Sequence, residues 1–213
     1  MKVLILGAAG QIGRMLTKDL LEQTNYELVL YARNASTRLK KNESNRVSIV
    51  DGDFANYDAL TKAMKGIDAI YLNNMQNNEG VQTIVKAMKD TGTKRIIVAS
   101  ILDIYDEVPG VFGAWNRKMI GVGYIQKHKE AASFVEIPDL DYTVLRLTWL
   151  YNQEGNRKYH LTSKGEPFDG AQVTRQAVSQ LILDILKDNS GKFIKTSIGV
   201  GEPNTNWDRP SFY

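Results

Sequence analysis

The sequence predicts an α/β fold, in which helices cover both faces of a doubly wound parallel sheet. Short apolar runs alternate along the chain with segments whose apolar residues recur at helical spacing. A glycine turn joins the first strand to the first helix, and polar residues follow several of the strands. These observations predict one Rossmann-like domain over residues 1–213, with a small C-terminal portion, about 148–213, on the substrate side.

The expected strands are short and apolar, as is typical of strands buried on both faces of a parallel sheet. They span residues 3–6, 27–32, 46–50, 68–72, 95–99, 142–147 and 193–200. Apolar stripes place helices at 12–20, 57–65, 81–88, 124–137 and 178–185; Gly66 ends the second and Pro138 the fourth. The stretch 103–123 contains Pro109 and several glycines, and we expect it to be a long loop.

The composition excludes several classes of function. The net charge of +3 is too small and too dispersed for a nucleic-acid-binding surface, so no nucleic-acid partner is expected. The chain has no cysteine and only two separated histidines, so no metal site is expected, and His160 should be solvated in its polar loop. No apolar run approaches the ~18 residues of a membrane span, and the first strand is too short for a signal peptide. A cytoplasmic protein with no membrane partner is therefore the default.

The glycine turn has the spacing that a dinucleotide pyrophosphate requires. Gly7 permits a tight turn, Gly10 lets the backbone approach the phosphates, and Gly13 lets the helix pack on its strand. The helix N-terminus then offers free N–H groups and the positive end of its dipole to the anion. The predicted cofactor contacts here are Gly7, Ala9, Gly10, Gln11, Ile12 and Gly13. The alternative is a glycine-rich turn that binds nothing.

Arg33 follows the second strand, about twenty residues after the glycine turn. An acidic residue at this place accepts the ribose hydroxyls of NAD, whereas an arginine attracts the 2′-phosphate of NADP. Arg33 therefore predicts a preference for NADP(H) over NAD(H), with Ser36 and Arg38 as helpers. The alternative is a solvated arginine next to a basic loop at 38–41.

Other strand ends supply the remaining expected contacts, because ligands of such sheets bind beyond the carboxyl ends of the strands. Asp53 and Phe54 are expected at the adenine, although helix capping and core packing would explain them equally well. Further along the cofactor we expect Asn73, Asn74 and Met75, then Ser100, and finally Thr148, Trp149 and Leu150. For residues 73–75 the alternative is a polar loop without a ligand.

Several of these segments together resemble the atypical short-chain dehydrogenase/reductases. They are the turn at 7–13, Tyr31-Ala-Arg33-Asn34, Asp51-Gly-Asp53 and Val98-Ala-Ser100. The branch that the chain resembles most is that of the small NmrA-like, NAD(P)H-binding proteins, on segments 145–150 and 173–178. The resemblance covers nearly the whole chain and implies a nicotinamide dinucleotide cofactor, but it does not identify a substrate.

The sequence departs from the wider family at the catalytic motif. That family carries Tyr-x-x-x-Lys on the helix after the fifth strand, and this chain has Tyr124-Ile-Gln-Lys127-His128 near that place. A catalytic Tyr124/His128 pair is one interpretation, and a packing stripe that continues through Ala131 is the other. Lys127 and Glu130 resemble a Lys and Glu of the NmrA-like branch, so Lys127 is an expected cofactor contact, and a surface ion pair is the alternative.

Ser100 occupies the place of the family's substrate-orienting serine, or it is a strand-end hydroxyl that caps the next turn.

Two functions follow from these features. The first is an NADPH-dependent reductase of a small apolar acceptor (a quinone, flavin or carbonyl), with Phe112, Trp115 and Met119 in a lid formed by the 103–123 loop. The second is a non-catalytic NADP(H) sensor that binds a protein partner, since the NmrA-like branch includes redox-sensing regulators. The aromatic tail at 204–213 fits either a surface loop or a contact segment.

Overall fold

Eight strands form one sheet in the computed structural model, which describes residues 1–39 and 44–213. Their order is β3-β2-β1-β4-β5-β6-β10-β8, and neighbours are parallel except for β10 and β8. The strands are β1 (Lys2–Leu6), β2 (Glu27–Ala32), β3 (Val47–Asp51), β4 (Ala69–Leu72), β5 (Arg95–Ile101), β6 (Asp141–Leu147), β8 (His160–Ser163) and β10 (Thr196–Gly201). The strand order reverses between β1 and β4, and this confirms the predicted doubly wound sheet.

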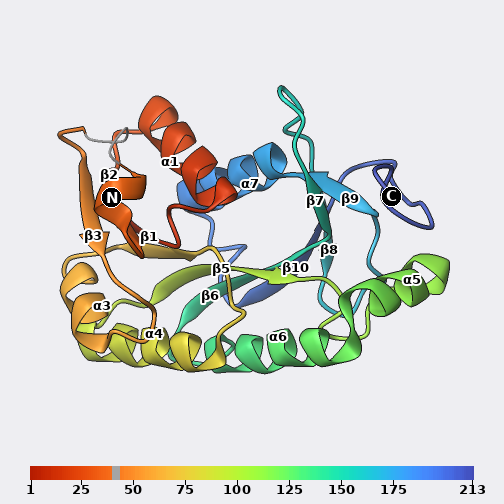
Figure 1. Cartoon of the computed structure of the whole chain (residues 1–213), viewed down its shortest axis with the longest axis horizontal. Coiled ribbons are helices and arrows are strands. Elements are labelled where there is room, and N and C mark those ends of the chain that lie inside the picture. The colour runs from red at the N-terminus through yellow and green to blue at the C-terminus, as the bar shows by residue number, and fades with distance from the viewer. Residues whose placement is uncertain (40–43) are drawn as a thin grey trace.

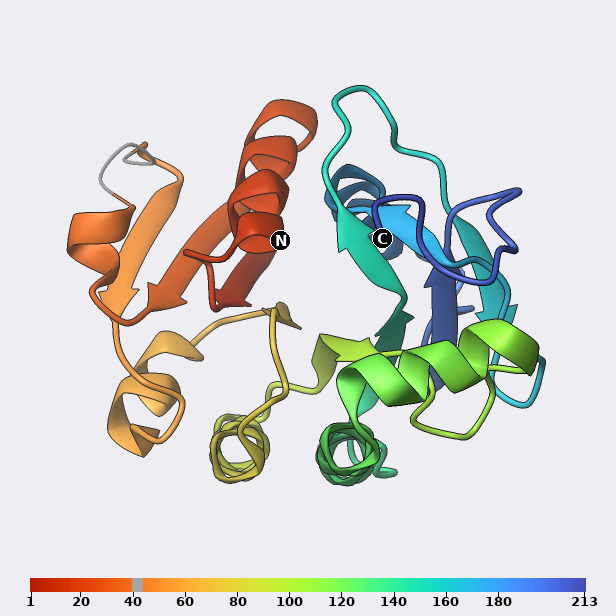
Figure 2. The same cartoon turned by 45° about the vertical axis from the view of Figure 1, so that its right-hand side comes forward.

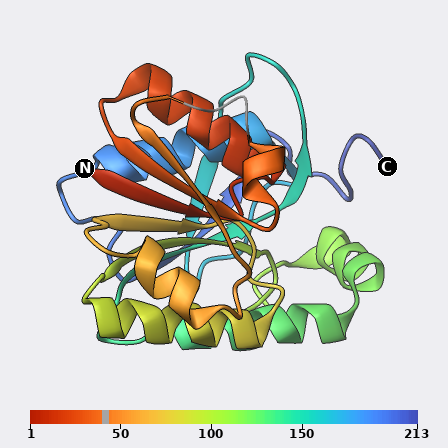
Figure 3. The ribbon, with the colours of Figure 1, turned by 60° about the vertical axis from the view of Figure 1, so that its left-hand side comes forward.

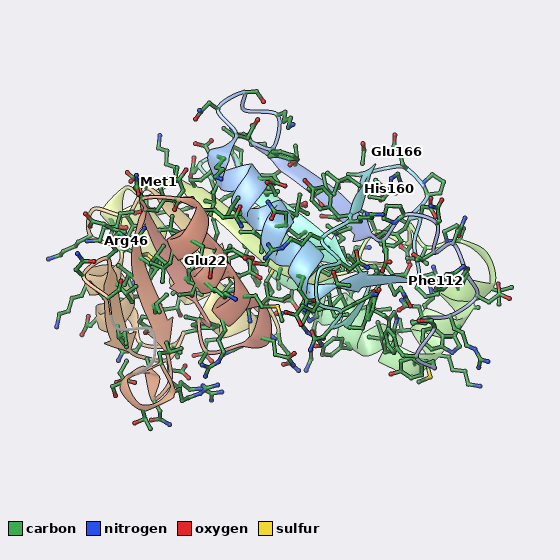
Figure 4. All side chains as sticks on the ribbon, turned by 90° about the horizontal axis from the view of Figure 1, so that it is seen from above. Met1, Glu22, Arg46, Phe112, His160 and Glu166 are labelled. Atoms are coloured by element: carbon green, nitrogen blue, oxygen red, sulfur yellow. The ribbon has the colours of Figure 1, made fainter. Side chains whose placement is uncertain are left out.

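Helices cover both faces of the sheet (Figures 1 and 3). On one face lie α1 (Gln11–Gln23) and α7 (Arg175–Lys187), which Figure 4 shows side by side. On the other face lie α3 (Tyr57–Ala63), α4 (Asn78–Thr91) and α6 (Val122–Val135). A short helix, α2 (Ala35–Arg38), follows β2. Lys40 and Lys41 of the expected basic loop lie outside the described residues.

The continuous apolar runs of the strands are explained by burial on both faces. In β1, Val3 and Ile5 pack with the core under α1 and α7, while Leu4 and Leu6 pack with the core under α3, α4 and α6. All four side chains are fully buried. Since neither face of this strand meets water, no position favours a polar residue.

The expected loop at 103–123 is wrong, because most of it is helical. Helix α5 (Gly110–Ile120) lies between two glycines with left-handed backbone, Gly110 and Gly121. Inside the helix, a Cβ on Gly113 would overlap the backbone oxygen of Val108. The glycine at 113 therefore permits close packing of a helix on the preceding loop, rather than chain flexibility.

The C-terminal portion contains elements that periodicity did not predict. Strands β7 (Trp149–Tyr151) and β9 (Gln172–Thr174) form a separate parallel pair, and β8 adds an antiparallel edge to the main sheet. Figure 2 shows β7, β9 and the C-terminal segment close to α5. The last strand begins at Thr196 instead of Phe193, which packs beside the core. Seen from above, Phe112 and His160 lie at the end of the molecule opposite Arg46 (Figure 4).

Candidate functional site

A cavity of about 410 Å³ opens at the carboxyl ends of the first four strands, where the strand order reverses. This is the edge at which parallel α/β sheets bind ligands. The residues that line it are Gly7, Ala9, Gly10, Ala32, Arg33, Arg38, Gly52, Asp53, Phe54, Asn74, Gln76 and Asn77. Eight of the predicted cofactor residues are therefore brought together in one cavity, from segments as far apart as 7–10 and 74–77.

The glycine turn forms one wall of the cavity. Gly7 has a φ of +83°, and its N–H donates to the carbonyl of Tyr31 at 2.9 Å. A Cβ on Gly13 would lie 2.9 Å from backbone atoms of Ala8 and Gly7, so only glycine allows α1 to start this close to the turn. No side chain of the described residues caps α1 at Gly10, which leaves its first-turn N–H groups free for an anion.

Arg33 lies at the cavity edge, where its Nε is 3.8 Å from Oδ2 of Asp53. Both side chains are largely exposed, so this ion pair holds Arg33 only weakly and leaves it available to a ligand. Arg38 lines the same cavity. Two arginines therefore stand beside the end of β2, next to the carboxylate of Asp53.

Ser36 has a different place from the one expected. Its backbone N–H donates to Asp51 at 3.4 Å, and the N–H of Ala35 donates to the same carboxylate. A side-chain hydrogen bond from Ser36, followed by these backbone bonds, holds the pKa of Asp51 below its usual range. The N–H groups at the start of α2 are thus already bonded to Asp51. An anion bound at this corner would therefore need hydrogen bonds from arginine side chains instead.

Arg14 is a residue that the sequence reasoning missed. Its Nε donates to the carbonyl of Ala9 and its Nη2 to the carbonyl of Arg38, each at 3.0 Å. The exposed guanidinium therefore ties the glycine turn to the end of α2 and helps to place Arg38 at the cavity. A signal was present, because an arginine directly follows Gly13 in the turn.

Asp53 and Phe54 face the cavity and also make contacts within the protein. Asp53 accepts from the N–H of Ala55 at 3.0 Å, and Phe54 stacks on Tyr31 with ring centroids 6.4 Å apart. Both also line the cavity. The cap of α3 is Asn56, which accepts from the N–H of Ala59, so Asp53 is not needed for capping.

The residues after β4 separate into cavity and core. Asn74 lines the cavity, and Gln76 and Asn77 extend this wall beyond the predicted residues. Asn73 packs against Gly7 and accepts a hydrogen bond from the hydroxyl of Tyr71 at 3.0 Å.

Two predicted contacts have side chains in the core. Met75 is fully buried under α3 and α4, and Ile12 packs in the core beneath α1. Neither residue lines the cavity, so any contact of Ile12 or Met75 with a cofactor would come from the backbone. Successive side chains of a strand or helix point to different faces, and the sequence motif alone does not show which of them point into the core.

The candidate catalytic residues lie on the buried side of α6 and at the end of β5. Ser100 and His128 are each 3% exposed, and the His128 ring centroid is 4.7 Å from that of Tyr124. Burial lowers the pKa of His128 to about 4, because a charged imidazole loses its hydration there. His128 is therefore neutral near pH 7, as a residue of a packing stripe would be.

Lys127 is exposed, and its expected partner Glu130 accepts a hydrogen bond from Nδ2 of Asn78 at 2.8 Å. This bond links α6 to the start of α4. Along this helix, Tyr124 is therefore partly buried, Lys127 is exposed and His128 is buried.

The segment after β6 faces the glycine turn. Thr148 is buried, Leu150 packs beside the core of α1 and α7, and Nε1 of Trp149 donates to Oδ1 of Asn116 at 3.0 Å. Asn152, at the end of β7, donates to Oε1 of Gln11 at 3.1 Å. This contact joins the C-terminal portion to the first turn of α1.

Two further findings concern the described part of the chain. Its histidines and carboxylates form no group of three that could hold a metal ion. Among its helices, none is both long enough and apolar enough to cross a membrane.

The sheet order, the glycine turn and the cavity at the strand reversal define a dinucleotide-binding protein of the Rossmann class. The sequence profile of a family described as NAD(P)H-binding matches residues 7–189. The chain therefore belongs to this NAD(P)H-binding family, and the resemblance to atypical short-chain dehydrogenase/reductases is confirmed.

Solved structures and a yeast protein are similar over most of the chain. A short-chain dehydrogenase/reductase of Veillonella parvula, in complex with NADP, is 36% identical over 99% of each chain, with a TM-score of 0.95. A Rossmann-fold NAD(P)-binding protein of Shigella flexneri is 31% identical over 100% of this chain and 98% of its own, with a TM-score of 0.79. A UPF0659 protein of Saccharomyces cerevisiae is 29% identical over 161 residues, 68% of each chain.

Proposed function

We propose that this protein is an NADPH-dependent reductase of a small apolar acceptor of the quinone, flavin or carbonyl class. The observation that carries the cofactor assignment is the pair Arg33 and Arg38 at the edge of the cavity, beside the end of β2. The Veillonella parvula protein, whose structure holds NADP, supports it with 36% identity over nearly the whole chain.

The cavity fits the adenosine half of the cofactor. Phe54 offers a ring face to the adenine, and the two arginines bind the 2′-phosphate. The uncapped start of α1 binds the pyrophosphate through its N–H groups. Asn73 and Asn74 run under the ribose. The nicotinamide half extends toward Ser100 and Thr148, and the portion at 148–213 forms the acceptor side.

The protein contributes binding, orientation and exclusion of water in this proposal. When bound, the reduced dinucleotide supplies a hydride, which carries two electrons, and a quinone or flavin takes its remaining proton from water. His128 is neutral and buried, so it does not supply that proton near pH 7. An acceptor that needs little acid catalysis therefore suits this site better than an alcohol or a sugar.

Replacement of Arg33 tests the cofactor assignment. Arg33→Ala should weaken NADPH binding roughly ten- to a hundredfold, because about 1.5–3 kcal/mol of charge-assisted hydrogen bonding is lost. NADH has no 2′-phosphate, so its affinity should change little. Arg33→Asp should go further, because its carboxylate repels the phosphate and accepts the free ribose hydroxyl of NADH. Calorimetric titration of both cofactors measures these effects.

Lys94→Ala is the matched control, since it removes one exposed positive charge just before β5, at the opposite edge of the sheet. Its two affinities should equal those of the wild type. Equal loss of NADPH and NADH in Arg33→Ala would show that Arg33 supports the fold or a general phosphate contact. A wild-type protein that prefers NADH would overturn the NADP assignment.

A panel of quinones, flavins and aldehydes, with loss of the absorbance of NADPH as the signal, tests the reductase assignment. Turnover with at least one acceptor is expected. Binding of NADPH without turnover of any acceptor would count against a reductase.

One observation favours a second function, a non-catalytic NADP(H) sensor that binds a protein partner. Val111, Met119 and Val122 expose apolar side chains on α5 and at the start of α6, beside the acceptor side. A partner that covered these residues would bury apolar surface. Pull-downs with oxidised cofactor, reduced cofactor and none should then recover different amounts of the same partner, and identical background in all three would exclude a sensor.

A further inference from the structure

Five aromatic side chains from α5, β7 and the C-terminal segment form a cluster beside the proposed acceptor side. Trp115 lies 4.9 Å from Trp149 between ring centroids, and Tyr213 lies 5.2 Å from Trp115 and 5.0 Å from Trp149. Phe112 stacks on Trp115 at 6.0 Å, and Phe212 lies 5.5 Å from Tyr213. We call these residues the aromatic cluster.

The aromatic cluster lies at the edge of the sheet where the cofactor is expected. Trp149 begins β7 two residues after β6 ends, and Asn152 just beyond β7 is bonded to Gln11 in the first turn of α1. In Figure 3 the parallel strands point to the right, and α5 and the C-terminal segment extend beyond them on that side. The cluster therefore lies beyond the carboxyl ends of the strands, and the strand that carries Trp149 is joined to the first turn of α1 through Asn152.

The two tryptophans are held in place. Trp149 donates through Nε1 to Asn116, which is fully buried inside α5. Trp115 packs against a small core that contains Leu102, Val108 and Phe168. Both indoles are thus fixed by contacts that do not involve the C-terminal segment.

Phe212 and Tyr213, in contrast, are held lightly. Their side chains are 46% and 51% exposed, although the Tyr213 ring makes edge contacts with both indoles. The backbone N–H of Tyr213 donates to Pro210, and Ser211 donates to Oε1 of the buried Gln172. Beyond Ser211, one backbone hydrogen bond and ring contacts keep Tyr213 on the tryptophans.

We propose that Trp115 and Trp149 form a binding site for a planar conjugated ring, and that the ring of Tyr213 fills this site until the acceptor displaces it. The inference rests on the proposed reductase function and narrows its acceptor to quinones and flavins. A planar ring gains stacking and edge contacts from two fixed indoles, whereas an aliphatic carbonyl has no ring face to offer. Displacement removes only an exposed side chain, so the fold stays intact.

The test measures binding of menadione, a planar naphthoquinone, by quenching of tryptophan fluorescence in the absence of cofactor. Trp207 is also exposed and would add signal, so every variant is made in a Trp207→Phe background. Tyr213→Ala should bind menadione about three- to tenfold more tightly, because one aromatic contact no longer has to be broken. Trp149→Leu should lose most of the menadione binding. Trp115→Leu should have the same effect, and it provides a second test if Trp149→Leu fails to fold.

The affinity for NADPH, measured calorimetrically, should be unchanged in Tyr213→Ala, which separates this site from the cofactor site. Equal menadione affinity in wild type and Tyr213→Ala would overturn the displacement, and equal affinity after loss of either cluster tryptophan would overturn the site. Menadione binding as expected, together with no turnover by NADPH, would instead refute the reductase and leave the ring site standing.

Discussion

Acidification should destabilise this protein through His128, which is 3% exposed on the inner face of α6. Burial lowers its pKa from the ordinary 6.5 to about 4. Between these values the unfolded chain binds a proton that the folded chain does not, so the free energy of unfolding falls as the pH falls from 6.5 toward 4. A shift of this size corresponds to about 3 kcal/mol at 1.36 kcal/mol per pKa unit.

The perturbation that isolates this effect is His128→Leu, which keeps an apolar side chain in the stripe and removes the titrating group. The unfolding free energy, from urea titrations at several pH values between about 7.5 and 4, should decrease by about 3 kcal/mol less in this variant than in the wild type. The comparison concerns the change with pH, so it does not depend on how the substitution alters stability near neutral pH.

His160→Leu is the control, because the other histidine is only half buried and lies 3.9 Å from Asp169 in solvent. Its stability should follow the wild type more closely than that of His128→Leu does. If the difference between wild type and His128→Leu stayed constant over the whole pH range, the imidazole would be charging in the folded protein. The conclusion that His128 is a neutral packing residue would then be wrong, and His128 would again be a candidate proton donor.

Two further predictions concern the glycine turn and the buried ion pair of β6. Gly13→Ala should lower the unfolding free energy by about 1–3 kcal/mol, because its Cβ meets backbone at 2.9 Å. A Cβ at Gly10 would overlap mainly the movable side-chain amide of Asn73, with the Gly7 carbonyl oxygen at 3.3 Å, so Gly10→Ala should weaken NADPH binding more than stability. Glu107→Gln should cost about 3–5 kcal/mol in urea unfolding, since it leaves Arg146 charged and buried, and adding Arg146→Met should restore most of it.

Strands β1, β2, β4 and β5 could be predicted because they are buried on both faces, and burial of this kind leaves an uninterrupted apolar run in the sequence. The glycine turn could be predicted as well, because the backbone geometry requires glycine at positions 7 and 13 and few other residues tolerate it. Local constraints of this type act within about ten residues, so the sequence displays them directly.

Other features depend on contacts between distant segments and have no local signature. Helix α5 contains two glycines, and Gly113 is explained only by the Val108 oxygen that packs on it. Strands β7 and β9 have three residues each, too few for a period to appear. Arg14 looks like any exposed helix residue until its bond to the Arg38 carbonyl is known.

The same difference separates the two halves of the candidate site. The adenosine half consists of strand ends and a glycine turn, and these predict a dinucleotide without knowledge of tertiary contacts. The proposed acceptor half depends on α5, which a chain of charges holds through the buried Asp103, Glu107 and Arg146. Arg146 on β6 donates to Glu107 at 2.6 Å, Glu107 accepts from the N–H of Asp103 at 3.0 Å, and Asp103 accepts from Arg117 of α5 at 2.9 Å.

This chain of charges holds the helix that carries Trp115, a residue of the proposed acceptor site, through residues that carry no recognisable motif. The outer links join the loop at 103–107 to β6 through Arg146 and to α5 through Arg117, and none of the four charged residues lines the cofactor cavity. A fold built in this way can keep its dinucleotide while its acceptor changes. The family and cofactor class were therefore readable from the sequence, whereas the acceptor requires the three-dimensional arrangement of α5, β7 and the C-terminal segment.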